Sequence, residues 1–155
     1  MIELLLYMAI LSILLVALFQ LLTSIFDVQL ESQSTASVSS DGRYILNRLG
    51  YDISRADAVT SPGVGSQGAN LVFTDGSETY TYSLTNGNLM LLATPSGTQD
   101  RLNGYNTSVS DISFLRLSDT GGELNTITVI FTLNSVVARR GGQERETFRT
   151  TIGTR

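Results

Sequence analysis

The chain has 155 residues, of which 42% are hydrophobic, as is typical of one modest domain with an appendage. It contains no cysteine and no histidine, which excludes disulfides, thiol nucleophiles, cysteine-ligated zinc sites and the commonest general base. All ten basic residues are arginines, against fourteen acidic residues, and the net charge of −4 argues against a broad nucleic-acid-binding surface.

The first expected element is an apolar helix over residues 1–26 that crosses a membrane. Residues 2–26 contain no Pro or Gly and a single charged residue, Glu3. As a helix they span about 37 Å, and the hydrocarbon core of a bilayer is about 30 Å thick. A cleavable secretory signal would have a basic stretch before the apolar run and small residues after it, and both are missing. A helix buried in a soluble core is the other alternative, and the unbroken apolarity disfavours it.

Residues 27–60 are expected to continue this helix in amphipathic form. One face is apolar, with spacings of three, four and seven residues: Val38, Ile45, Leu49, Ile53 and Ala56. The opposite face is polar: Asp41, Arg43, Asn47, Arg48, Asp52 and Arg55. Residues 29–40 are rich in Ser and Gln, so they form either a solvated part of one helix or a loosened stretch between two helices. We favour one helix of some 55 residues, which would be about 80 Å long.

Residues 61–155 are expected to form an antiparallel β-sheet domain. A cluster of turn residues at 61–70 ends the helical region, and 94–108 is a second expected loop. Asn86-Gly87 between two alternating runs indicates a β-hairpin. Alternating runs predict the other strands at 71–75, 110–117, 126–137 and 144–152, with Ile127, Val129, Phe131 and Leu133 pointing inward. Five or six strands in hairpin order predict one sheet that covers the amphipathic half of the helix, an α+β fold.

The sequence predicts no catalytic, cofactor-binding or metal-binding residue, and hence no enzyme. Asp52 with Asp57 and Glu144 with Glu146 are carboxylate pairs by sequence, but such pairs are usually solvated. The glycines of residues 61–68 lack the lysine and the preceding strand of a phosphate-binding loop.

Two further groups of residues have structural interpretations. Arg139 and Arg140 precede Gly141-Gly142, where they would solubilise a hairpin tip or, alternatively, contact a partner. Aromatic residues at strand spacing are interpreted as core residues and not as a ligand platform: Tyr80, Tyr82, Phe114, Phe131 and Phe148.

The opening residues, MIELLLYMAILSILLVALFQ, resemble the N-terminal methylation motif of type IV pilin-like proteins. In that family an Ile-Glu-Leu core stands before a long apolar helix; Ile2, Glu3 and Leu4 match this core, and Met1 stands for the apolar residue before it. The motif covers only about the first twenty residues, but a glutamate at this point of an otherwise uncharged span is specific. The resemblance implies a protruding helix packed on an antiparallel sheet, with Ile2, Glu3 and Leu4 as assembly residues.

Two departures from the family pattern refine this expectation. In the family, two further mature residues and a basic leader that a prepilin peptidase removes come before the motif, so the leader-peptidase site is expected upstream of Met1, outside this sequence. Major pilins often carry a Pro in the span and a Cys pair near the C-terminus, and this chain has neither. The stretch DGRYILNRLGYDISRADAV resembles the helix of J-type minor pseudopilins and W-type minor pilins, which favours a minor subunit.

The resemblance implies a minor pilin or pseudopilin of a bacterial type IV pilus or type II secretion-like filament. The expected location is the inner (cytoplasmic) membrane, crossed once, with the C-terminal domain extracytoplasmic, and then the filament. Expected partners are other pilin or pseudopilin subunits, the inner-membrane assembly platform, the prepilin peptidase and the lipid bilayer. Glu3 would guide docking by pairing with a neighbouring subunit, or alternatively lie at the lipid headgroups near a helix N-terminus. The alternative function is a membrane-anchored extracytoplasmic β domain that binds a ligand or partner without polymerising.

Overall fold

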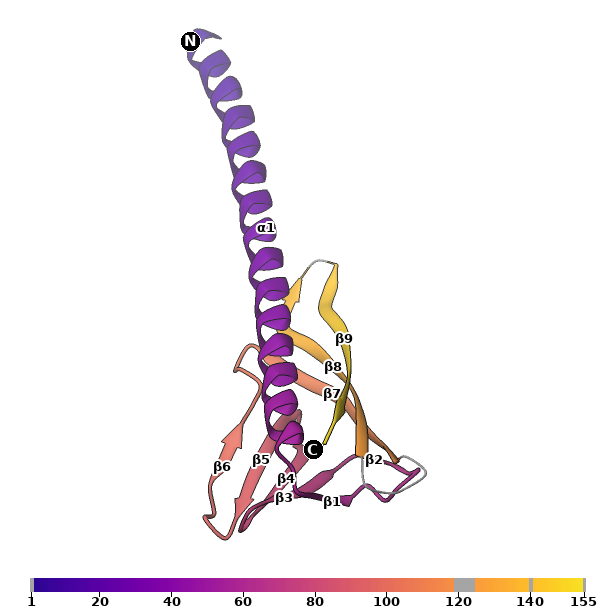
Figure 1. The fold of residues 1–155 in the computed structure, drawn as a ribbon. Helices are drawn as coiled ribbons and strands as arrows, with labels where there is room; N and C mark the ends of the chain where they lie inside the picture. The colour runs from indigo at the N-terminus through magenta and orange to yellow at the C-terminus, as the bar shows by residue number, and fades with distance from the viewer. Residues whose placement is uncertain (1, 119–124, 140, 155) are drawn as a thin grey trace.

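One long helix leads into a small domain of two β-sheets (Figure 1). The computed structural model describes residues 2–118, 125–139 and 141–154. Helix α1, Ile2–Ser54, runs without a break through the Ser- and Gln-rich stretch, so the prediction of one continuous helix is confirmed. At 53 residues it is about 80 Å long, and its N-terminal half protrudes from the domain.

The end of the helix differs from the expectation that the helical segment reaches residue 60. The helix ends at Ser54, where the Arg55 amide donates to the Asp52 carbonyl, and Ala58–Ser61 forms strand β1. Val59 pairs with Phe73 of another strand, and its side chain is buried. Pairing with β3 therefore outweighs the weak local preference of residues 58–61, which form a strand and not a further turn of helix.

The β-domain contains two antiparallel sheets, so the prediction of one sheet is wrong. The first sheet has the order β1-β3-β4-β5-β6, and the second has the order β2-β7-β8-β9. The strands after β1 are β2 (Gln67–Gly68), β3 (Leu71–Asp75), β4 (Glu78–Thr85), β5 (Asn88–Thr94), β6 (Gln99–Arg101), β7 (Thr107–Ser118), β8 (Asn125–Arg139) and β9 (Gly142–Gly153). The chain enters the second sheet at β2, returns to the first at β3, and leaves it after β6.

The longer strands lie where the sequence predicted them. Strand β3 matches its predicted bounds, and β4 and β5 form a hairpin closed by Asn86-Gly87. Both turn residues have positive φ, 50° and 76°, which is the reason for the Asn-Gly pair. The short strands β1, β2 and β6 lie in or next to predicted loops and were missed.

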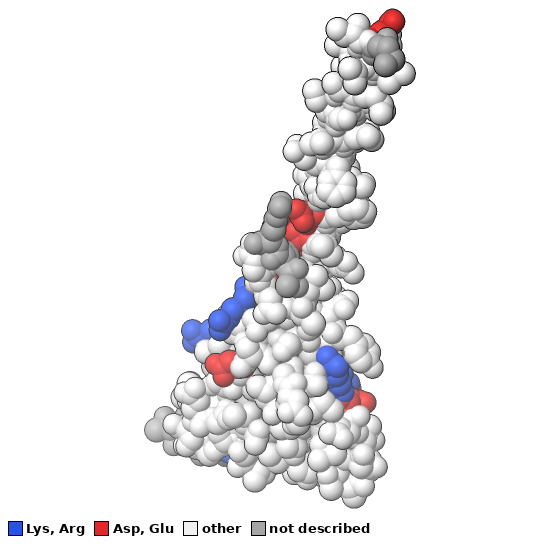
Figure 2. All heavy atoms as spheres, turned by 180° about the vertical axis from the view of Figure 1, so that it is seen from behind, with Lys and Arg blue, Asp and Glu red and all other residues white. Residues whose placement is uncertain are grey.

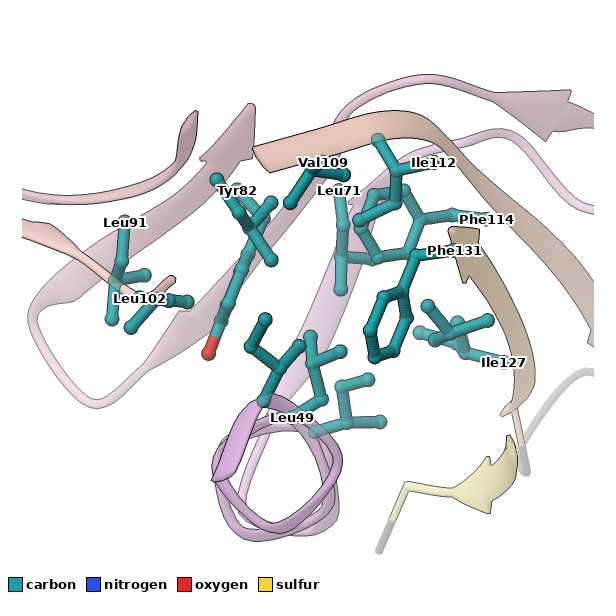
Figure 3. Close-up of a cluster of buried hydrophobic side chains, with 14 of the residues drawn as sticks. Leu49, Leu71, Tyr82, Leu91, Leu102, Val109, Ile112, Phe114, Ile127 and Phe131 are labelled. Carbon is teal, nitrogen blue, oxygen red and sulfur yellow. The ribbon is translucent and has the colours of Figure 1, made fainter. Parts of the chain in front are cut away.

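The core lies where the inner faces of both sheets meet the lower half of α1. Figure 3 shows side chains from the two sheets converging on the helix around Leu49. Ile127, Val129, Phe131 and Leu133 of β8 are buried, as predicted. The predicted core aromatics take the expected places: Tyr82, Phe114 and Phe131 are buried, while Tyr80 and Phe148 are partly buried and pack against the core.

Helix α1 approaches β9 closely because residue 42 is glycine. Gly42 is buried, and a Cβ added there would lie 2.1 Å from the ring of Phe148. That ring stacks on Phe131 with 5.2 Å between ring centroids, so it is held from the other side. Gly50, in the same helix, has open space around its Cβ direction.

Two acids on the polar face of the helix bond to distant segments, so the expectation that Asp52 is solvated is wrong. Asp41 is partly buried and accepts a hydrogen bond from the Gly104 amide at 2.7 Å. Asp52 is 8% exposed; it accepts a hydrogen bond from the Tyr82 hydroxyl and one from Arg48 Nε at 2.8 Å. Burial raises the pKa of the Tyr82 hydroxyl, and the hydrogen bond to Asp52 raises it further. Burial alone would lower the pKa of Arg48, but the hydrogen bond and the charge of Asp52 raise it. Asp52 and Tyr82 can be buried because their polar groups are hydrogen-bonded, whereas Arg48 is partly exposed.

Candidate assembly helix

The upper part of α1, residues 2–33, is exposed along its whole length, and we call it the bare half of the helix. Every residue from Ile2 to Gln33 is exposed, and the first buried residue is Ser34. Twenty large hydrophobic side chains between Ile2 and Leu30 are exposed. A contiguous apolar surface of this extent is not left in water by soluble proteins, so it requires lipid or protein around it.

The helix has the length and the internal bonding that a bilayer requires. It is long and apolar enough to cross a membrane, and none of its most apolar stretch is buried inside the protein. Backbone groups of a spanning segment must be bonded internally, as they are in a helix. The two hydroxyls of this stretch also bond within it: Ser12 donates to the Met8 carbonyl at 2.7 Å, and Thr23 donates to the Gln20 carbonyl at 2.9 Å.

Glu3 lies in the first turn of α1, between the exposed side chains of Ile2 and Leu4. The structure thus places the three predicted assembly residues together at the tip of the bare helix, and Met1 lies outside the described residues. Figure 2 shows the protruding helix as almost free of charge, with acidic atoms at its end. An acid in this turn is favoured by the helix dipole, and within the described chain it has no ion-pair partner.

The lower end of the helix is tied to the first sheet by Arg55. Its guanidinium lies 3.0 Å from Asp75, is centred 5.1 Å from the Tyr51 ring centroid, and donates to the Tyr51 hydroxyl. The hydrogen bond to Tyr51 and the charge of Asp75 raise the pKa of Arg55. These exposed contacts join the residue just after α1 to strand β3, while the buried core holds the helix against the sheets.

The remaining polar residues do not assemble into a reactive centre. Asp57 is exposed and accepts a hydrogen bond from the Gly76 amide at 2.7 Å, so it does not meet the buried Asp52. Glu144 and Glu146 lie on the edge strand β9, and the hairpin predicted beside Arg139 is formed by β8 and β9, while Arg140 lies outside the described residues. Among the described residues, no three His, Cys, Asp or Glu lie together as a metal site would require.

One exposed aromatic residue was missed by the sequence interpretation. Tyr105 lies between β6 and β7, in the predicted loop 94–108, and is 90% exposed. The run Asn-Gly-Tyr-Asn, an aromatic residue among turn formers, was the available signal.

Comparison with known proteins adds no relative: no protein-family model, no curated protein and no solved structure matches the chain. The class that the fold defines is an α+β protein with one long N-terminal apolar helix, able to span a membrane, packed on antiparallel β-sheets.

Proposed function

We propose that the chain is a minor pilin or pseudopilin subunit of a type IV pilus or type II secretion-like filament. The observation that carries the proposal is the bare helix, which from Ile2 to Phe26 is exposed, predominantly apolar and uncharged apart from the carboxylate of Glu3 at its tip. A simple anchor needs the apolar residues but not the acid. The resemblance of Ile2, Glu3 and Leu4 to the pilin motif supplies a role for the acid.

The physical basis is an exchange of environments. In the inner membrane the bare helix is surrounded by lipid; in a filament it is surrounded by the helices of other subunits, so its apolar surface stays covered. A carboxylate in the filament core needs a cation, because an unpaired charge in a low-dielectric interior is costly. The N-terminal ammonium of a neighbouring subunit would provide this cation. Pairing with Glu3 would then favour one axial register of the helices.

The remaining expectations follow from this proposal. The domain that starts at Ser34 would lie outside the cytoplasmic membrane, and α1 would cross that membrane once before assembly. A prepilin peptidase, an inner-membrane assembly platform and other pilin-like subunits would be its partners. The segment from Asp41 to Val59, similar to J-type pseudopilins and W-type pilins, supports a minor rather than a major subunit.

The experiment replaces Glu3 with Gln and with Asp in cells that assemble the filament. We expect Glu3→Gln to stay in the membrane fraction but to fall at least tenfold in sheared surface filaments or in the secretion assay, because it removes the charge and keeps the size. Glu3→Asp should retain part of the assembly. If Glu3→Gln assembles like the natural chain, the role of Glu3 fails. If neither the natural chain nor any variant can be crosslinked to pilin-like proteins, a membrane-anchored β domain is the better description.

A further inference from the structure

Strand β9 is the one long edge strand in the described sheets. The other three sheet edges are formed by short strands: β1 has four residues, β6 has three and β2 has two. Strand β9 has 12 residues, and within the described chain its only strand partner is β8 (Figure 1). A long edge strand presents a row of unpaired amide and carbonyl groups, which a short one does not. The edge of β9 is therefore where the β-domain can accept a further strand.

The pairing of β9 with β8 is regular over most of its length. Residues 145–153 of β9 face residues 126–134 of β8 one to one, and the register shifts only beyond Asn134, toward the hairpin tip. In a regular antiparallel ladder, every second residue of the outer strand directs its amide and carbonyl away from the neighbouring strand. A partner in an extended conformation can bond to these groups without any change in β9.

The outer face of β9 carries two arginines without a partner in the described chain. Arg145 and Arg149 lie on one face because an even number of residues separates them. Phe148 lies on the other face and packs against the core, so the arginines point away from the core. Both arginines are exposed, and neither forms an ion pair with a described residue. Four residues along a strand place the two guanidinium groups about 13 Å apart.

The inner face of the same edge is apolar along its lower part. Phe148 and Ile152 of β9 pack against the core but are only partly buried. Leu46 of α1 is also partly buried, and it follows Gly42, the residue that touches Phe148, by one helical turn. A strand added to β9 would therefore meet apolar side chains on its inner face and guanidinium groups on its outer face.

A second copy of this chain does not complement the edge. Two β9 strands related by a twofold axis pair antiparallel with like faces together, so the arginine face of one meets the arginine face of the other. Glu144 and Glu146 occupy the opposite face of each strand, so no glutamate would face an arginine. Charge therefore favours a different partner, one with acids on the face that continues the arginine face.

We infer that the edge of β9 binds an extended segment of another protein, with carboxylates four residues apart on one face and apolar side chains on the other. Backbone hydrogen bonds to β9 hold the segment. The carboxylates opposite Arg145 and Arg149 set its register, because a slip by one residue moves them to the wrong face. The inference concerns the β-domain and does not rest on the proposed function.

The test measures binding of fluorescent peptides to the full chain in nonionic detergent by fluorescence anisotropy. The acidic probe is acetyl-Val-Thr-Val-Glu-Val-Thr-Thr-Glu-Thr-amide, and lysines replace both glutamates in the basic control. We expect the acidic probe to bind at least fivefold more tightly, because two facing pairs change from attraction to repulsion in the control. In the double variant Arg145→Gln/Arg149→Gln this preference should fall below twofold. Arg43→Gln, which removes an exposed arginine from α1, should keep it.

Backbone pairing is tested separately from charge. Only every second amide of an added strand points toward β9. Two N-methylated forms of the acidic probe, one methylated at the odd-numbered and one at the even-numbered peptide residues, should therefore differ at least tenfold in affinity. Equal affinities of the two forms would show that charge attracts the peptide without strand pairing, which refutes the inference.

The other outcomes are equally decisive. Absence of binding by the acidic probe, or equal binding of the acidic and basic probes, would overturn the inference. A dimer of the natural chain that excludes the probe, detected by sedimentation, would show that a second copy occupies the edge instead. Equal thermal unfolding of the natural chain and its variants shows that the β-domain is unchanged. None of these results concerns Glu3, so failure here leaves the proposed function intact.

Discussion

The two halves of α1 have one backbone geometry but opposite surroundings. In the upper half all side chains are exposed and most are apolar; in the lower half Val38, Ile45, Leu49 and Ile53 are fully buried against the sheets. The lower half is fixed by packing, whereas the upper half depends on an environment that the chain itself does not provide. The same helical backbone is therefore stabilised by packing against the sheets in one half and depends on surrounding lipid or protein in the other.

The largest contrast is expected from removing a leucine in each half. Leu49→Ala deletes a fully buried side chain and should destabilise the domain by about 2–5 kcal/mol, from lost burial and the cavity that remains. Leu14→Ala, at a 54% exposed position, should leave the domain unchanged. Denaturant unfolding of the full chain in detergent, followed by β-sheet circular dichroism, measures both. Equal destabilisation by the two variants would show that the halves are not independent.

An introduced charge should have a large effect in the upper half of α1 and almost none at an exposed position of the lower half. Leu14→Arg places a cation in the middle of the span, which costs about 3 kcal/mol on insertion scales, or roughly a hundredfold in partition. Asn47→Arg, at an exposed position of the lower half, should change neither membrane location nor domain stability. Membrane and soluble fractions are compared by immunoblot. Unchanged membrane retention of Leu14→Arg would contradict a spanning role.

The buried polar contact of the lower half predicts a pH effect. Because the pKa of Tyr82 is raised in the folded domain, folded and unfolded Tyr82 are both protonated below about pH 10. Above this pH the unfolded chain loses the proton and the folded chain keeps it, so the free energy of unfolding falls as pH rises.

The matching variant is Tyr82→Phe. At pH 7 it should destabilise the domain by about 1–3 kcal/mol, because buried Asp52 loses a donor. Above pH 10 its stability should fall less steeply than that of the natural chain. Denaturant midpoints from pH 7 to 11 measure both effects, and parallel curves for the two chains would refute the linkage.

Two glycines of the lower half should respond with opposite signs, and Gly50 should give the smallest effect of all. Gly42→Ala should destabilise the domain by about 1–3 kcal/mol, because the new methyl group meets Phe148. Gly50→Ala should stabilise it by about 0.5–1 kcal/mol, since nothing blocks the methyl group and alanine favours helix. Thermal unfolding of both variants tests the pair; stabilisation by Gly42→Ala would show that Phe148 can move aside.

Helices and strands were predictable from the sequence where the spacing of apolar residues extends over many residues or a turn has a specific residue pair. The apolar spacing through Leu49 gave the helix, and Asn86-Gly87 gave the first hairpin. The strands β2 and β6, of two and three residues, are too short to carry a period, so the division into two sheets was not predictable. The same spacing does not distinguish an acid that meets solvent from one that meets a donor on a distant strand, as Asp52 does.

The part of the candidate site that is local in sequence was predictable, and the part formed by distant segments was not. Glu3 and the apolar span are local in sequence, so their position at the exposed tip of α1 followed from the helix itself. The Tyr105 loop depends on Asp41 and Asn103, which are brought together by contacts between segments up to 66 residues apart. No pattern within the loop records these contacts.

Helix α1 has no break between Ile2 and Ser54, so its two halves should move as one stiff rod. With no proline in the helix and no hinge between its halves, a displacement or rotation at the Glu3 end is transmitted to the sheets. Force arrives at β9 where Gly42 touches Phe148, and at β3 through Arg55 and Asp75. In a molecule of this shape, we expect a displacement of the helix tip to change the orientation of the domain.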